Sequence, residues 1–129
     1  MSEKLPERLK YNQDYSWVEV ENGEAKLGII QPAADRVKRF VFIDLPEEGE
    51  EVEKGDNYTS LEAMKWSGHL SSPVSGKIIE VNNDLYDNPE KINEDPYGSW
   101  IVKVKLSDPS ELEELMDAEE AEEWVEKNM

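Results

Sequence analysis

The sequence predicts a mainly β fold with small helices at its periphery and at its C-terminus. Short apolar or alternating segments recur along the chain, and turn residues such as Asn22-Gly23 separate them. Helix-start signals introduce only brief stretches, most of them near the C-terminus. The chain has 129 residues, of which 37% are hydrophobic, so it suits one domain over residues 1–129 with a core of modest size.

The first half of the chain predicts a pair of strands, a short helix and a third strand. Asn22-Gly23 is the favoured two-residue signal for a hairpin. Pro32 suits the first turn of a helix, because that turn does not need the missing N–H. The apolar run that follows is interrupted only by Asp44, which predicts a strand buried on both faces. The expected strands are Tyr15–Val20, Ala25–Ile30 and Phe40–Leu45, and the helix has Ala33, Ala34 and Val37 on its apolar face.

The second half predicts three more strands and three short helices. Apolar and basic residues alternate in the last strand, which indicates that one of its faces is buried. Asn88 before Pro89 is an N-cap pattern for a single helical turn. Ser110 and Asp117 each stand three residues before a glutamate, which is the pattern of a capping box. The expected segments are the turn Val52–Asp56 before a strand Tyr58–Ala63, the turn Val74–Lys77 before a strand Ile78–Val81, a strand Trp100–Leu106, and helices at Asn88–Glu90, from Ser110 and from Asp117.

The charge balance narrows the classes of partner. The chain has 31 acidic and 14 basic residues and a net charge of −17. Such a surface repels nucleic-acid phosphates and anionic membranes and favours a basic protein partner, although solubility alone is an equally open explanation of the charge.

The absence of cysteine excludes disulfides and thiolate metal sites. The N-terminus lacks the apolar run of a signal peptide, so we expect a cytoplasmic protein, and a monomer.

Lys65 stands between two expected strands, and the residues alone leave its role open. Met64-Lys65 lacks the Asn-Gly or Gly-x signal of a hairpin, which favours a strand running through an exposed Lys65. A functional lysine is either a buried catalytic amine or an exposed attachment point, and display between strands suits attachment better. No carboxylate pair, phosphate loop or metal cluster in the sequence predicts a catalytic or metal site.

The segment around Lys65 resembles the modification hairpin of lipoyl- and biotinyl-carrier domains. Leu61–Trp66 carries the lysine, and Ser67–Lys77 follows it directly. Over nearly its full length the chain resembles the H-protein family of the glycine cleavage system. The matching segments, in order, are Tyr15–Val18, Leu27–Ile29, Val41–Pro46 with Gly49, Val52–Asp56, Leu61–Trp66, Ser72–Asn82 and Asn88–Gly98.

The resemblance implies a fold and a set of site residues. The fold is a lipoyl/biotinyl-type β-sandwich, a flattened barrel with small peripheral and C-terminal helices. Lys65 matches the lysine to which family members attach lipoate, Glu62 the glutamate that lipoylating enzymes read, and Gly76 the glycine of the opposite turn. His69 is a further candidate near the lipoyl arm, although a lone histidine on a hairpin is more often structural.

The resemblance also implies a carrier with no catalytic residues of its own, which acts in glycine catabolism and one-carbon transfer. Lipoate on Lys65 would carry the aminomethyl group of glycine between three enzymes. These partners are glycine decarboxylase, a pyridoxal-phosphate protein, an aminomethyltransferase, and dihydrolipoyl dehydrogenase. A lipoate ligase or lipoyl transferase would attach the cofactor.

Three positions depart from the family pattern and leave the choice of partner open. Tyr15 stands where a histidine is usual, Lys38-Arg39 stand where Gly-Asp is usual, and Gly98–Trp100 is one residue shorter than usual. One alternative is therefore a lipoyl carrier for sulfur-compound oxidation or for lipoate relay. A biotin carrier is less favoured, because Trp66 follows Lys65 where the biotin motif has methionine. An unmodified acidic interaction module is the last alternative.

Overall fold

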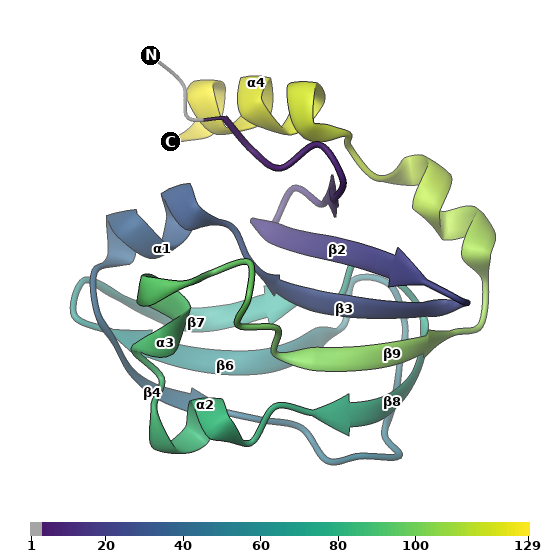
Figure 1. The fold of residues 1–129 in the computed structure, drawn as a ribbon, viewed down its shortest axis with the longest axis horizontal. Coiled ribbons are helices and arrows are strands. Elements are labelled where there is room, and N and C mark those ends of the chain that lie inside the picture. Colours follow the sequence, from purple (N-terminus) through teal and green to yellow (C-terminus); the bar gives the residue numbers. More distant parts are fainter. Residues whose placement is uncertain (1–3) are drawn as a thin grey trace.

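A computed structural model describes residues 4–129 as two packed β-sheets with helices at their edges (Figure 1). The strands are β1 (Lys10–Tyr11), β2 (Ser16–Glu21), β3 (Glu24–Ile29), β4 (Phe40–Asp44), β5 (Glu51–Val52), β6 (Asn57–Ala63), β7 (Trp66–Ser71), β8 (Gly76–Val81) and β9 (Val102–Leu106). The helices are α1 (Gln31–Val37), α2 (Asp84–Asp87), α3 (Lys91–Glu94), α4 (Ala118–Asn128) and the 3-10 helix η1 (Pro109–Glu114).

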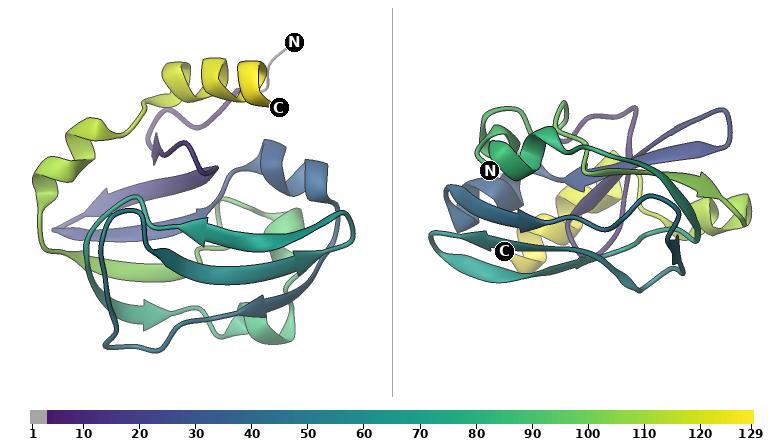
Figure 2. Two further views of the ribbon diagram at one scale, coloured as in Figure 1. Left: turned by 180° about the vertical axis from the view of Figure 1, so that it is seen from behind. Right: turned by 90° about the horizontal axis from the view of Figure 1, so that it is seen from below.

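The larger sheet has the strand order β1-β2-β3-β9-β8-β5, and the smaller sheet has the order β4-β6-β7. All of these pairings are antiparallel. Seen from behind, the smaller sheet lies in front of the larger one (Figure 2). The predicted mainly β sandwich with small helices is therefore confirmed. Strand pairing within residues 4–129 gives two separate sheets and no closed barrel.

Both sheets contribute to one hydrophobic core. β9 lies between β3 and β8, where Val102 and Val104 are buried while Lys105 is exposed, as the alternation predicts. Leu61 of β6 and Ile43 of β4 belong to the same cluster of buried side chains. Each fully buried aliphatic side chain contributes about 1.5–3 kcal/mol, so this shared core holds the two sheets together.

The first hairpin and the helix after it agree with the predictions. Asn22 and Gly23 have positive φ values of 53° and 78°, as a type I′ turn requires. α1 has Pro32 in its first turn and buries Ala33 and Ala34. The chain therefore leaves the larger sheet at the end of β3 and passes through α1 to the edge of the smaller sheet.

The prediction that β4 is buried on both faces is wrong. β4 is an edge strand of the smaller sheet, and Val41 and Phe42 are 55% and 41% exposed. An antiparallel sheet can cover the core with one face and leave the other in water. An irregularity in the pairing between Phe40 and Phe42 lets two consecutive side chains, Val41 and Phe42, face away from the core. The Phe42 ring meets the Tyr86 ring of α2 edge-on, with centroids 6.2 Å apart.

The helix predictions after β8 are partly confirmed. The capping box of Asp117 and Glu120 is present and opens α4. The capping box predicted at Ser110 is wrong: the segment forms the 3-10 helix η1, and its N-cap is Asp108, whose side chain accepts from the Ser110 backbone N–H. Asn88 does not cap α3, which begins at Lys91, and α2 was not predicted. Within residues 4–129, no helix is long and apolar enough to cross a membrane.

Candidate functional site

Lys65 occupies the tip of the hairpin that joins β6 to β7. Ala63 pairs with Trp66, so Met64 and Lys65 form a two-residue turn, and both are exposed. The structure thus favours a turn at Lys65 over a continuous strand. Neither residue is among the described residues with a positive φ, so the turn is not of the mirror-image type that requires asparagine or glycine.

Hydrogen bonds from outside the hairpin hold this turn. The Met64 N–H donates to the carbonyl of Arg39 at 3.0 Å, and the Lys65 N–H donates to the carbonyl of Val37 at 2.9 Å. The acceptors belong to residues 37–40, from the last residue of α1 to the first residue of β4, which we call the strap. The missing turn signal is explained by these contacts, because the backbone groups of the turn are satisfied by a distant segment.

A groove of about 360 Å³ lies beside Lys65. Its walls come from α1, from β7 and from the C-terminal end of the chain. Arg36 Nη1 donates a 2.9 Å hydrogen bond to the carbonyl of Met129, which ties the end of α4 to α1. Most of the lining side chains are apolar, and the lining consists of Asp14, Tyr15, Ile29, Ala33, Arg36, Val37, Lys65, Trp66, Leu70, Asn128 and Met129.

The other candidate residues of the hairpin lie on its strands. Glu62 is exposed on β6, opposite Phe42 on one side and Ser67 on the other. His69 is exposed on β7 opposite Ser60, whose Oγ lies 3.4 Å from His69 Nδ1. That pair stands three residue pairs below the one that closes the turn, roughly 10 Å along the strand. The structure therefore keeps Glu62 close to Lys65 but does not bring His69 into the groove.

Gly76 lies at the opposite end of the sandwich, and it belongs to a strand rather than to the expected turn. It is the first residue of β8 and pairs with Val52 of β5 and Leu106 of β9. A Cβ at this position would lie 2.1 Å from the carbonyl oxygen of Lys105, so the neighbouring backbone leaves no room for one. In Figure 1 the β6–β7 turn is at the left, below α1, whereas β8 begins at the right.

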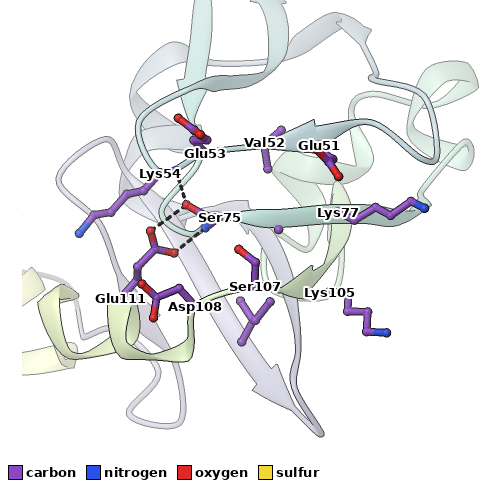
Figure 3. Close-up of a pocket in the computed structure, with 12 residues that line it drawn as sticks. Glu51, Val52, Glu53, Lys54, Ser75, Lys77, Lys105, Ser107, Asp108 and Glu111 are labelled. Carbon is purple, nitrogen blue, oxygen red and sulfur yellow. Dashed lines mark hydrogen bonds between the residues drawn. The ribbon is translucent and has the colours of Figure 1, made fainter.

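A second hollow, of about 760 Å³, lies at the Gly76 end (Figure 3). The Ser75 N–H and Oγ each donate a 2.7 Å hydrogen bond to the carboxylate of Glu111, and the Lys54 N–H donates to Ser75 Oγ at 2.8 Å. These bonds fasten η1 to the connection between β7 and β8, which indicates a structural role. Among the described residues, no group of three or more His, Cys, Asp or Glu side chains could hold a metal ion.

Two of the departures from the family pattern meet around Lys65. Tyr15 lines the groove and has a φ of 62°, and the strap contains Lys38 and Arg39. Lys38 has φ 70° and ψ −157°, a conformation that glycine adopts far more easily than other residues. The sequence alone does not place these positions together, because the contact joins the end of α1 to a turn that lies far along the chain.

The third departure lies elsewhere, in the connection from α3 to β9. Trp100 is half-buried, and its carbonyl accepts a 2.8 Å hydrogen bond from Asn82 Nδ2. Arg36 and Met129 also contribute to the groove wall, which the sequence did not predict. The basic residue in the last turn of α1 was visible in the sequence, but its partner across the fold was not.

Comparison with known proteins identifies the family. A family model described as "Glycine cleavage H-protein" matches residues 9–128. The chain belongs to this family. The glycine cleavage system H protein of Staphylococcus epidermidis is 42% identical over 122 residues, which cover 94% of this chain and 97% of that protein. The one from Halalkalibacterium halodurans is 44% identical, with coverage of 94% and 95%.

The fold agrees with this assignment. The crystal structure of a glycine cleavage system H protein from Mycobacterium marinum matches with a TM-score of 0.84 and 31% identity, and the match covers 96% of this chain and 98% of that one. The H-protein family comprises non-catalytic lipoyl carriers of the glycine cleavage system. The predicted carrier role is therefore confirmed, and membership of this system implies partner enzymes within it.

Proposed function

We propose that lipoate is attached through an amide bond to the Nζ atom of Lys65. The observation that carries this proposal is the exposed position of Lys65 at the tip of a turn whose two N–H groups are both held by the strap. An attachment point needs an accessible amine and a fixed direction of display. The exposed tip supplies the first of these, and the strap supplies the second.

The residues around Lys65 suit a long and mostly apolar arm. Side chains such as Ala33, Val37 and Leu70 line the groove, so a saturated chain folded back from Lys65 would bury apolar surface there. Tyr15 and Trp66 would cover the arm close to its root. The bound cofactor would supply the disulfide that accepts and carries an aminomethyl group. The protein contributes the display of the arm, a resting groove and a docking surface.

Glu62 is the proposed recognition residue for the lipoylating enzyme. It is exposed, lies three residues before Lys65, and is absent from the ion pairs found among the described residues. A carboxylate that has no ion-pair partner among residues 4–129 and is adjacent to the turn is available to a basic group on a lipoate ligase or lipoyl transferase. His69 stays a candidate with a weaker basis, since it lies outside the groove.

The proposed partners are glycine decarboxylase, the aminomethyltransferase and dihydrolipoyl dehydrogenase. Support comes from the family and from the charge, because 31 acidic against 14 basic residues favour partners with basic docking faces. We place the protein with these enzymes in the cytoplasm as a monomer. The relatives named above are all glycine cleavage proteins, which favours this pathway over sulfur-compound oxidation or lipoate relay.

Enzymatic lipoylation tests the attachment site. The protein is incubated with a lipoate ligase, ATP and lipoate, and the adduct is located by intact mass and peptide mapping. We expect one lipoyl group on Lys65, none in Lys65→Arg, and full modification of the control Lys77→Arg, which removes an exposed lysine at the other end. Arginine keeps the charge but lacks the primary amine. Full modification of Lys65→Arg would contradict the proposal, and a biotinyl group on protein from its native host would favour the biotin carrier.

A further inference from the structure

The strap is held along both of its edges. The carbonyls of Val37 and Arg39 point to the hairpin and accept from the Lys65 and Met64 N–H groups. The carbonyl of Lys38 and the N–H of Phe40 point the other way, so they need different partners.

Asn93 of α3 supplies both of those partners. Its Nδ2 donates to the Lys38 carbonyl at 2.7 Å, and its Oδ1 accepts from the Phe40 N–H at 2.9 Å. Nδ2 also lies 3.4 Å from the carbonyl of Ala34 in α1. The side-chain amide therefore binds the strap as a neighbouring strand would, with one donor and one acceptor on the same edge.

Asn93 is itself attached to the core. Its neighbour Ile92 is fully buried, and Ser99 Oγ donates a 3.0 Å hydrogen bond to the carbonyl of Lys91. α3 is only four residues long, so these anchors rather than the helix itself fix its position. The φ of Lys38 is +70°, and a residue with a Cβ keeps such a conformation only where its surroundings determine it. The bond from Asn93 to the Lys38 carbonyl is one such constraint.

We propose that Asn93 is a positioning residue for the attachment of lipoate. It holds the strap against the hairpin, and the strap in turn fixes the turn that displays Lys65. The proposal rests on Lys65 being the attachment site. Asn93 need not touch the cofactor or the lipoylating enzyme, because its side chain bonds to the strap and the backbone of the strap bonds to the turn. The sequence alone did not predict that a residue of the Asn88–Gly98 segment positions the strap.

Amide hydrogen exchange measured by NMR on the unmodified protein tests directly whether Asn93 holds the strap and the turn. Asn93→Ala removes all of the side-chain bonds to the strap, and Asn93→Asp keeps the acceptor but lacks the donor. We expect the Met64 and Lys65 amides to exchange about tenfold faster in both variants. The Ile101 amide, which donates to the Leu27 carbonyl at 2.7 Å within the sandwich, should change far less.

Asn82→Ala is the matched control. Asn82 is also half-buried, and its Nδ2 donates a 2.8 Å hydrogen bond to a backbone carbonyl, that of Trp100. It touches neither the strap nor the hairpin in any contact found for it. We expect this variant to leave the Met64 and Lys65 amides protected. Asn93→Ala should also lower kcat/KM for enzymatic lipoylation by about tenfold, whereas Asn82→Ala should leave it unchanged.

Several outcomes would overturn the proposal. One is rapid exchange of the Met64 and Lys65 amides in the wild-type protein. A second is an equal rise in exchange at Ile101, since Asn93 would then support only global stability. A third is a loosened turn with unchanged lipoylation. If Asn93→Ala does not fold, Asn93→Ser, whose hydroxyl can keep one bond, takes its place alongside the wild-type measurement.

The two proposals fail in distinguishable ways. A lipoyl group mapped to a residue other than Lys65 would refute the attachment site, whatever the exchange data show. A lipoyl group on Lys65, together with Met64 and Lys65 amides whose exchange is unchanged in the Asn93 variants, would refute only the positioning role of Asn93.

Discussion

The two ends of the sandwich differ in how hydrogen bonds and packing hold their connecting segments. At one end the Met64-Lys65 turn projects into solvent, and a strap from α1 holds its backbone without covering its side chains. At the other end the connection before Gly76 is tied down, because Ser75 is bonded to Glu111 of η1 and Gly76 is packed against the backbone of β9. We call the end with the Met64-Lys65 turn the display end, because it exposes a side chain. We call the end with Ser75 and Gly76 the closed end, because its connection is tied to η1 and β9.

The difference lies in which atoms carry the contacts. The display end uses backbone N–H groups, which leaves the Lys65 and Glu62 side chains free for other proteins. The closed end uses side-chain carboxylates and the absence of a side chain. Substitutions at the closed end should therefore affect stability, whereas substitutions at the display end should affect modification.

The largest expected effect is at the closed end. Gly76→Ala places a Cβ 2.1 Å from the Lys105 carbonyl oxygen, and a backbone atom in the middle of a sheet cannot move away cheaply. We expect a loss of about 3 kcal/mol in the free energy of unfolding, measured by urea denaturation. The neighbouring exposed change Lys77→Ala is the control and should stay within about 0.5 kcal/mol. The folded fraction of Gly76→Ala should still be lipoylated normally. A specific loss of lipoylation would contradict the view that the closed end affects only stability.

A smaller and opposite effect is expected at the strap. Lys38→Gly relieves an unfavourable conformation that costs about 1–3 kcal/mol, while glycine itself costs about 0.5–1 kcal/mol in chain entropy. We expect a net gain of about 1 kcal/mol, seen as a higher urea midpoint. Lys38→Ala is the control, because it removes the charge but keeps the Cβ and should show no gain. Equal stability of the glycine and alanine variants would refute the strain at Lys38.

The smallest expected effect on stability is at Glu62. Glu62→Ala removes an exposed carboxylate with no ion-pair partner among the described residues, so stability should change by less than about 0.5 kcal/mol. Lipoylation should nevertheless become slower, as a time course of intact mass would show. Glu53→Ala, an exposed carboxylate at the far end, should leave that rate unchanged. Equal rates for both variants would remove Glu62 from the recognition site.

Local patterns in the sequence were reliable where the cause was local. Asn22-Gly23 specifies its own turn through two positive φ values, and the capping box of Asp117 and Glu120 is satisfied within one helical turn. The alternation of β9 follows directly from its place between two strands of a half-covered sheet. The apolar run in β4 misled, because hydrophobic composition does not distinguish a buried central strand from an edge strand whose outer aromatic ring packs on a small helix.

The sequence by itself determined the mainly β class, most of the strands and, through its resemblance to a family, the lysine of interest. Only the tertiary structure showed why that lysine stands at a turn. The Met64-Lys65 pair has no turn signal of its own, since its hydrogen bonds go to Val37 and Arg39. Asn93, more than fifty residues further along the chain, bonds to Lys38 and Phe40, the residues on either side of Arg39. Backbone bonds between distant segments carry no residue signature, because every non-proline residue offers the same N–H and C=O.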